Sequence, residues 1–247
     1  MEVHKPKPVH SWRELLTEIG VIVIGVAVAL AAEQLVESLH WQHKIADARQ
    51  AMMLELRDDD GPQAYIRLAL APCIDKQLET LKSAIVANAS RADIERQTAR
   101  IQQANVTWDT VAWNTLQTSD VASHMAPEEL RDWSVPYIRI PVLDTVNLRE
   151  NEDVVALQPS GLTSEHLTAG EAEAMLAAIR RLHDSHRLMV LHSTSLLSGM
   201  LQNGVSLTPG QKQHALRDFR KILGDCVIEP RISVRDQHPY GAAASPP

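Results

Sequence analysis

One uncharged apolar run constrains this sequence more than any other feature. Residues 19–32, IGVIVIGVAVALAA, contain no charged or polar side chain. They lie between Trp12 and Trp41, whose separation corresponds to roughly 43 Å in an α-helix, close to the thickness of a bilayer with its headgroups. Because tryptophan is enriched at membrane–water boundaries, the pattern predicts a membrane-spanning helix.

The spanning segment must extend beyond this run, because a bilayer core requires about 20 apolar residues. Flanking leucines and a valine lengthen the apolar character to about 25 positions, which is long enough to span. Glu18 and Glu33 then lie near the two ends, where their carboxylates can reach water at the headgroups. We therefore predict a transmembrane helix over residues 13–39.

Two alternatives remain open for the same segment. Residues 29–31, Ala-Leu-Ala, fit the small-x-small pattern of a signal-peptide cleavage site, although Glu14 and Glu18 occupy the region that is normally basic. A buried helix in the core of a soluble protein is the second alternative. The absence of Pro and Gly from residues 33–57 favours a retained anchor, because a cleavage region should be extended.

Basic residues give the orientation a slight bias. Lys5, Lys7 and Arg13 precede the span, against Lys44 and Arg49 at a similar distance after it. Because basic loops stay in the cytoplasm, we expect the N-terminal side inside. The predicted parts are a short cytoplasmic tail (1–12), the membrane helix (13–39), a helical extracytoplasmic domain with its stalk (40–235) and a disordered tail (236–247).

Apolar residues at helical spacing predict a stalk and further helices beyond the span. One stripe is expected to end at the run Asp58–Pro62, and a second helix should follow it, with a kink at Pro72 and Cys73 on its core side. The stalk stripe consists of Trp41, Ile45, Ala48, Met52 and Leu56.

Start signals predict the later helices. We expect a polar helix from Ser90 to about Ala104, and others beginning at Thr107, Pro127, Thr168 and Thr208. The Thr168 helix should reach Gln202 and form the centre of the bundle, and Gly224 should end the Thr208 helix. The core stripe of the Thr168 helix is Met175, Ile179, Leu182, His186, Met189, Ser193, Leu196 and Met200.

The fold class follows from the absence of a strand pattern. No stretch alternates strictly between apolar and polar residues, as a half-buried strand does. Pro136 and Pro141 must bend or break the Pro127 segment, which leaves residues 137–157 without a clear prediction. We predict an all-α protein in which the transmembrane helix continues into a stalk and an antiparallel helical bundle.

Composition limits partners and covalent links. The formal charge of -7, without a basic patch that carries aromatic residues, argues against nucleic acid. Cys73 and Cys226 are the only cysteines, and an extracytoplasmic domain permits a disulfide between them; two buried thiols are the alternative.

Candidate sites for chemistry are few. His183 and His186 share a helix face at metal-ligand spacing, but they supply only two ligands; a third would have to come from elsewhere, such as Glu165 or His166. The alternative places His186 in the core and His183 in solvent. The sequence contains no phosphate-binding loop and no nucleophile motif, so we expect no metal, no cofactor and no catalysis.

A strip of small residues marks one face of the membrane helix. Gly25, Ala29 and Ala32 recur at spacings of four and three, and Glu33 continues the row. Small residues let helix backbones approach closely in lipid, so this strip predicts a helix–helix interface. Chance remains the alternative, because Gly and Ala are common in membrane helices.

The N-terminal pattern combines a tryptophan, an acidic residue, a Val/Ile/Gly/Ala run ending in an Ala-Leu pair, Glu33-Gln34 and a charged stalk. With residues 112–119, AWNTLQTS, it resembles an uncharacterised family of bacterial single-pass inner-membrane proteins. The resemblance covers residues 1–57 and, more loosely, the middle of the chain. It implies an anchored helical domain in the periplasm and no site residues.

These expectations converge on a membrane-bound, non-catalytic protein. We expect an accessory or scaffold subunit of a membrane complex, in contact with the lipid bilayer and joined through its membrane helix to a protein partner or a second copy. A periplasmic domain that senses a small molecule is the alternative, and an enzyme is the third possibility.

Overall fold

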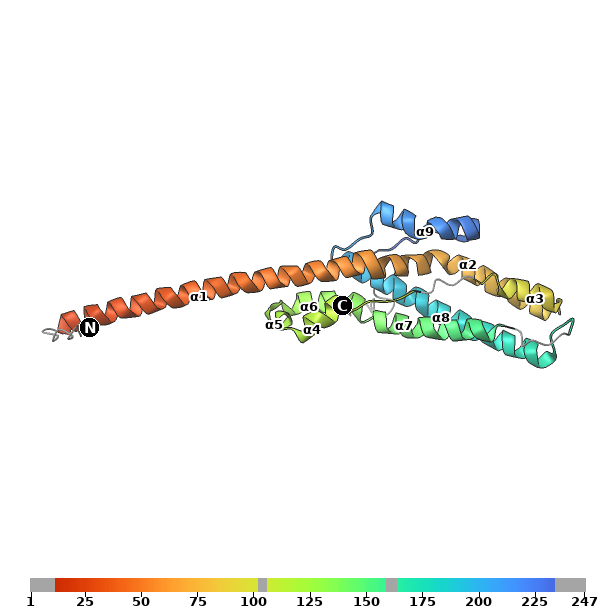
Figure 1. The fold of residues 1–247 in the computed structure, drawn as a ribbon, viewed down its shortest axis with the longest axis horizontal. Helices are drawn as coiled ribbons and strands as arrows, with labels where there is room; N and C mark the ends of the chain where they lie inside the picture. Colours follow the sequence, from red (N-terminus) through yellow and green to blue (C-terminus); the bar gives the residue numbers. More distant parts are fainter. Residues whose placement is uncertain (1–11, 102–105, 159–163, 234–247) are drawn as a thin grey trace, which may run out of the picture.

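The computed structural model describes residues 12–101, 106–158 and 164–233, and these residues form an all-α fold, as predicted. Figure 1 shows a long helix projecting from an elongated helical body. The described residues contain no strand, only one isolated bridge between Ser90 and His166. The expected tails, residues 1–12 apart from Trp12 and residues 236–247, lie outside the described part.

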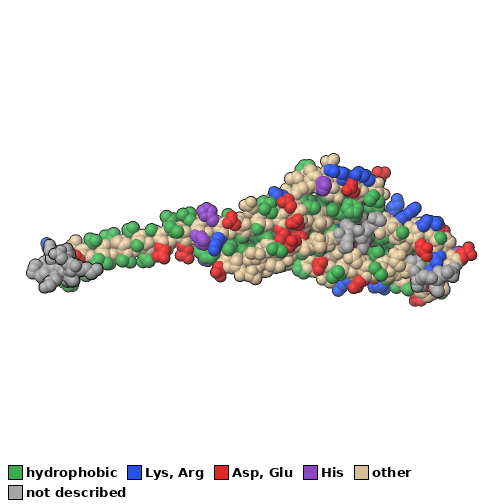
Figure 2. Space-filling model, in the orientation of Figure 1, with side chains coloured by type: hydrophobic (Ala, Val, Ile, Leu, Met, Phe, Trp, Pro, Cys, Tyr) green, Lys and Arg blue, Asp and Glu red, His purple; other side chains and the backbone are tan. Residues whose placement is uncertain are grey.

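The projecting helix is α1 (Trp12–Glu55), and its first half contacts almost nothing. Its most apolar 18-residue window has a mean hydropathy of 2.4, and no part of that window is buried. By length and composition it is the one helix in the described part that could cross a membrane. Figure 2 shows its apolar side chains covering the projecting rod.

The second half of α1 forms the predicted stalk and enters the body. Met52 and Leu56 are fully buried, and Ile45 is nearly so, because the stripe faces the neighbouring helices. The helix does not stop at Asp58–Pro62, and that prediction was wrong. It widens into a π-helical turn, η1 (Leu56–Asp60), and continues as α2 (Gly61–Val86).

The π-turn explains how the chain stays helical through Gly61 and Pro62. The Gly61 N–H donates to Leu56 O, five residues back, and Pro62 occupies the first turn of α2, where its missing N–H costs little. A Cβ at Gly61 would lie 2.5 Å from Met200 Cε and 2.6 Å from Leu56 O. Only glycine allows so close an approach to α8.

The bundle is built from α2, α7 (Ile140–Ala156) and α8 (Ala169–Gln202). α8 packs against both others and against α6, which makes it the centre of the bundle. The Thr168 capping box and the end at Gln202 are confirmed. All eight residues of its predicted stripe are buried: Met175, Ile179, Leu182, His186, Met189, Ser193, Leu196 and Met200.

Four shorter helices complete the middle of the chain: α3 (Arg91–Thr98), α4 (Val111–Thr118), α5 (Val121–His124) and α6 (Pro127–Tyr137). Ser90 caps α3 as expected, but α3 ends at Thr98 rather than near Ala104. α4 begins at Val111 rather than at Thr107, because the Asp109 carboxylate accepts the Val111 N–H (3.0 Å). The chain breaks between α6 and α7, which resolves residues 137–157.

The last helix, α9 (Pro209–Leu223), packs on α2 from the side opposite α4–α6. Its capping box at Thr208 and its stop at Gly224 are confirmed, since Gly224 has a φ of +68° that favours glycine. A short 3-10 turn, η2 (Gly224–Cys226), follows.

Candidate functional site

The predicted membrane interface is open to solvent in the single chain. Gly25, Ala29, Ala32 and Glu33 are all exposed, and a Cβ added to Gly25 would meet nothing within 4 Å. The strip therefore contacts no other described part of this chain. Lipid or a second helix can occupy it without rearrangement of the fold.

A small cluster of rings and charges fastens α4–α6 to the stalk. The Trp41 ring stacks on His124 at a centroid distance of 3.7 Å, and Lys44 Nζ lies 5.0 Å from the centre of the same ring. One turn further on, Arg49 donates to both carboxylate oxygens of Glu129, and its Nη2 lies 2.6 Å from Oε2. Trp41 thus anchors α5 to the stalk.

Two buried carboxylates hold the start of α4 against the π-turn. Glu55 Oε2 accepts the N–H of Ala112 (2.8 Å), and Asp60 Oδ1 accepts the N–H of Asp109 (3.0 Å). Each has a second oxygen, Glu55 Oε1 and Asp60 Oδ2, that is buried and accepts no hydrogen bond from the described residues. Burial, with Glu55 nearby, raises the pKa of Asp60 to about 7.

A buried ion pair joins α2 to α7 at the level of His186. Arg67 and Glu150 form a salt bridge in which each side chain is only 1% exposed. His186 on α8 places Nδ1 3.6 Å from Glu150 Oε1 and Nε2 3.9 Å from Asp75 Oδ1. Burial lowers the pKa of His186, and the Arg67 charge lowers it further, so the neutral imidazole is favoured.

The two histidines of the weak metal candidate do not act together. His186 is enclosed in the core, whereas His183 is exposed beside a surface hollow that it shares with Asp75 and Glu79. His166 Nδ1 lies near Asn88 O (3.0 Å), close to the start of α8, about 25 Å of helix away from His183. No three His, Cys, Asp or Glu side chains in the described ranges could hold one metal ion.

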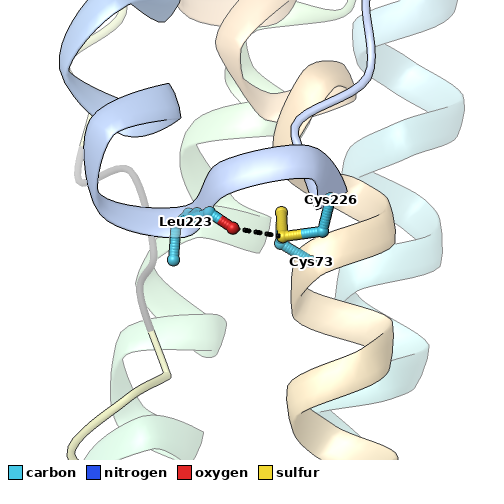
Figure 3. The surroundings of a disulfide bond; sticks show 3 residues. All are labelled: Cys73, Leu223 and Cys226. Atoms are coloured by element: carbon cyan, nitrogen blue, oxygen red, sulfur yellow. Dashed lines mark hydrogen bonds between the residues drawn. A yellow bond between two sulfur atoms is a disulfide. The ribbon is translucent and has the colours of Figure 1, made fainter.

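The structure joins Cys73 of α2 to Cys226 of η2 by a disulfide, with Cα atoms 5.0 Å apart (Figure 3). Cys226 Sγ also lies 3.3 Å from Leu223 O. A disulfide sulfur carries no proton, so this approach is a contact rather than a hydrogen bond. Beyond the bond, the Ile228 N–H donates to Ala69 O (3.1 Å), which holds the following segment on α2.

Sequence patterns gave no indication of either buried charge cluster. The run Asp58–Pro62 has the composition of a turn, and nothing local shows that Asp60 would be enclosed. Arg67 was detectable only by its position, because it lies three residues from both Ala64 and Leu70 on a face that is otherwise apolar. Its partner Glu150 is distant in sequence.

Comparison of this chain with protein-family models, curated proteins and solved structures finds no match. The functional argument therefore rests on the chain's own geometry.

Proposed function

We propose that this protein is a single-pass membrane protein whose helical bundle serves as an accessory or scaffold subunit, binding other proteins outside the cytoplasm. The observation that carries the proposal is α1. Its apolar half is exposed along its whole length and is continuous with a stalk buried in the body. An exposed surface of this kind requires lipid or a partner, and here both can be satisfied at once.

The disulfide supports the extracytoplasmic side. Disulfides persist in oxidising compartments such as the bacterial periplasm, and thiols in the cytosol are kept reduced. A body in the periplasm and one spanning helix place the N-terminal side in the cytoplasm. The resemblance to bacterial inner-membrane proteins, carried by residues 1–57, agrees with this orientation.

The form of the body favours protein binding over catalysis or sensing. The buried charges Arg67, Glu150 and His186 are enclosed and already contact one another, so they offer no open site. The hollow between α2, α8 and the C-terminal segment, lined by Tyr65 and Met200, holds about 120 Å³, whereas ligand sites typically measure about 300–1,000 Å³.

Purification of the full chain in mild detergent, followed by mass spectrometry, tests the proposal. We expect a protein partner at fixed stoichiometry, or a defined homo-oligomer. A monomer that carries a bound small molecule would overturn the scaffold function in favour of a sensor.

A further inference from the structure

A surface groove runs beside the stalk where α1 meets α4. It has a volume of about 650 Å³ and extends from Lys44 to Asp59, which is about 22 Å of helix. Apolar side chains form much of its lining, among them Ala48, Ala51 and Leu116. Its dimensions match an extended segment or a short helix of a partner better than a compact small molecule.

The charges of the groove have one predominant sign. Four carboxylates line it, those of Asp47, Glu55, Asp58 and Asp59, against the single ammonium of Lys44. Asp58 is paired with Arg57, whereas Asp47 and Asp59 form no ion pair with any described residue. Figure 2 shows acidic side chains gathered where the rod enters the body.

Glu55 adds a second, independent observation. Its side chain lines the groove, yet the residue is only 8% exposed. Oε2 is occupied by the Ala112 N–H, while Oε1 is buried and accepts no hydrogen bond from the described residues. The nearby Tyr137 hydroxyl donates to Met52 O (3.3 Å). A buried carboxylate oxygen without a donor is costly, and a cationic side chain entering the groove would satisfy it.

We propose that this groove binds a basic amphipathic helix of a partner protein, whose apolar face packs on Ala48 and Ala51 and whose Lys or Arg side chain reaches Glu55. This inference rests on the proposed scaffold function and specifies the chemistry of its partner. Asp47 and Asp59 flank the helix and contribute to charge complementarity and to the rate of association.

Fluorescence anisotropy of the full-length protein in mild detergent tests the groove. The probe is a labelled helical peptide of about 15 residues, with leucine on one face and Lys and Arg on the other; its control has Glu in place of every basic residue. We expect saturable binding of the basic peptide that weakens with salt, and no binding of the acidic one.

Variants of the groove give the decisive comparison. Glu55→Gln keeps an acceptor for Ala112 and should weaken binding about tenfold or more, because it removes the buried charge. Asp47→Asn with Asp59→Asn should weaken binding about threefold and flatten its salt dependence. Ala51→Leu fills the groove from an exposed position and should abolish binding without unfolding the protein.

The matched control is Glu173→Gln with Asp184→Asn, which removes two exposed carboxylates from α8. It should change affinity by no more than about twofold. Equal losses in this control, equal binding of the acidic peptide, or no saturable binding by the wild type would overturn the groove as a peptide site. Displacement of the peptide by spermidine at similar affinity would identify a small cation as the occupant and overturn it too.

The outcome is separable from that of the scaffold proposal. If the wild type retains a stoichiometric partner in detergent, and Ala51→Leu and Asp47→Asn/Asp59→Asn retain it equally, the groove is not the binding surface and the scaffold function stands. If no partner is retained but the peptide binds, the scaffold function fails and the groove stands.

Discussion

At the scale of single residues, Asp60 links stability to pH. Its carboxyl is fully buried beside Glu55, and its pKa is raised to about 7 from an ordinary value of 3.8. A raised acid pKa means that the folded state holds its proton more tightly than the unfolded state. The stabilisation is therefore complete below about pH 4 and is lost as the pH rises through about 7.

Asp60→Asn isolates this effect, because asparagine keeps an acceptor for the Asp109 N–H without ionising. Relative to this variant, the wild type should lose about 2 kcal/mol of unfolding free energy between pH 5 and pH 8. Urea unfolding of both proteins at the two pH values measures the difference. Parallel pH profiles would show that Asp60 does not titrate in this range.

The ion pair between Arg67 and Glu150 gives a second prediction at this scale. Both side chains are 1% exposed, so Glu150→Gln leaves a buried guanidinium without its counter-charge and should cost about 3–5 kcal/mol. Thermal or urea unfolding checks this loss.

The control removes a carboxylate from an exposed ion pair. Asp218→Asn, which breaks the pair with Lys221, should cost well under about 1 kcal/mol. Replacement of both buried partners, Arg67→Met with Glu150→Leu, should restore most of the lost stability. A small loss for Glu150→Gln alone would contradict the enclosed ion pair.

At the scale of elements, the disulfide ties η2 and the segment after α9 to α2. It closes a loop with a sequence separation of 153, for which the chain-entropy model gives up to about 5 kcal/mol. Reduction should therefore lower the melting temperature of the wild type and have no effect on the double variant Cys73→Ser/Cys226→Ser. Two thiols that alkylate freely in unfolded, unreduced protein would refute the bond.

The membrane helix carries the other prediction for an element. Leucine at Gly25 would fill the small-residue strip, and so Gly25→Leu should weaken self-association or partner retention. Val23→Leu, on another face, should not. Cross-linking in membranes at matched expression compares the two, and equal yields would refute the interface.

Helices whose signals are local were predictable from the sequence. The capping boxes at Thr168 and Thr208 and the stripe of α8 specify their own structure, because each depends on residues within a few turns. The path through Asp58–Pro62 was not predictable. Its helical form depends on the packing of Gly61 against Met200 and on the carboxylates that hold residues 109–112, and both are tertiary contacts.

The candidate sites divide in the same way. The small-residue strip and both cysteines could be named from spacing and composition, although the pairing of Cys73 with Cys226 required the fold. The groove beside the stalk could not be predicted, because α1 and α4 are separated by the whole of α2 and α3. Glu55 is an ordinary stalk glutamate until Ala112 packs against it.

At the scale of the whole molecule, one continuous helical path runs from the exposed apolar rod through the stalk into the bundle. Trp41 and Arg49 fasten α5 and α6 to this path, and α8 packs along α2 beyond it. If the rod spans a membrane, the groove lies immediately beyond Trp41, at the membrane surface. A partner with its own membrane helix could then contact both the small-residue strip and the groove.

Protease accessibility in spheroplasts tests the central claim most directly. The account predicts that a C-terminally tagged protein stays with washed spheroplasts and that protease added from outside removes its bundle without lysis. Release of the protein into the periplasmic wash would mean a cleaved or soluble protein. Protection of the bundle until the spheroplasts are lysed would place it in the cytoplasm, and either result would contradict a membrane-anchored scaffold outside the cytoplasm.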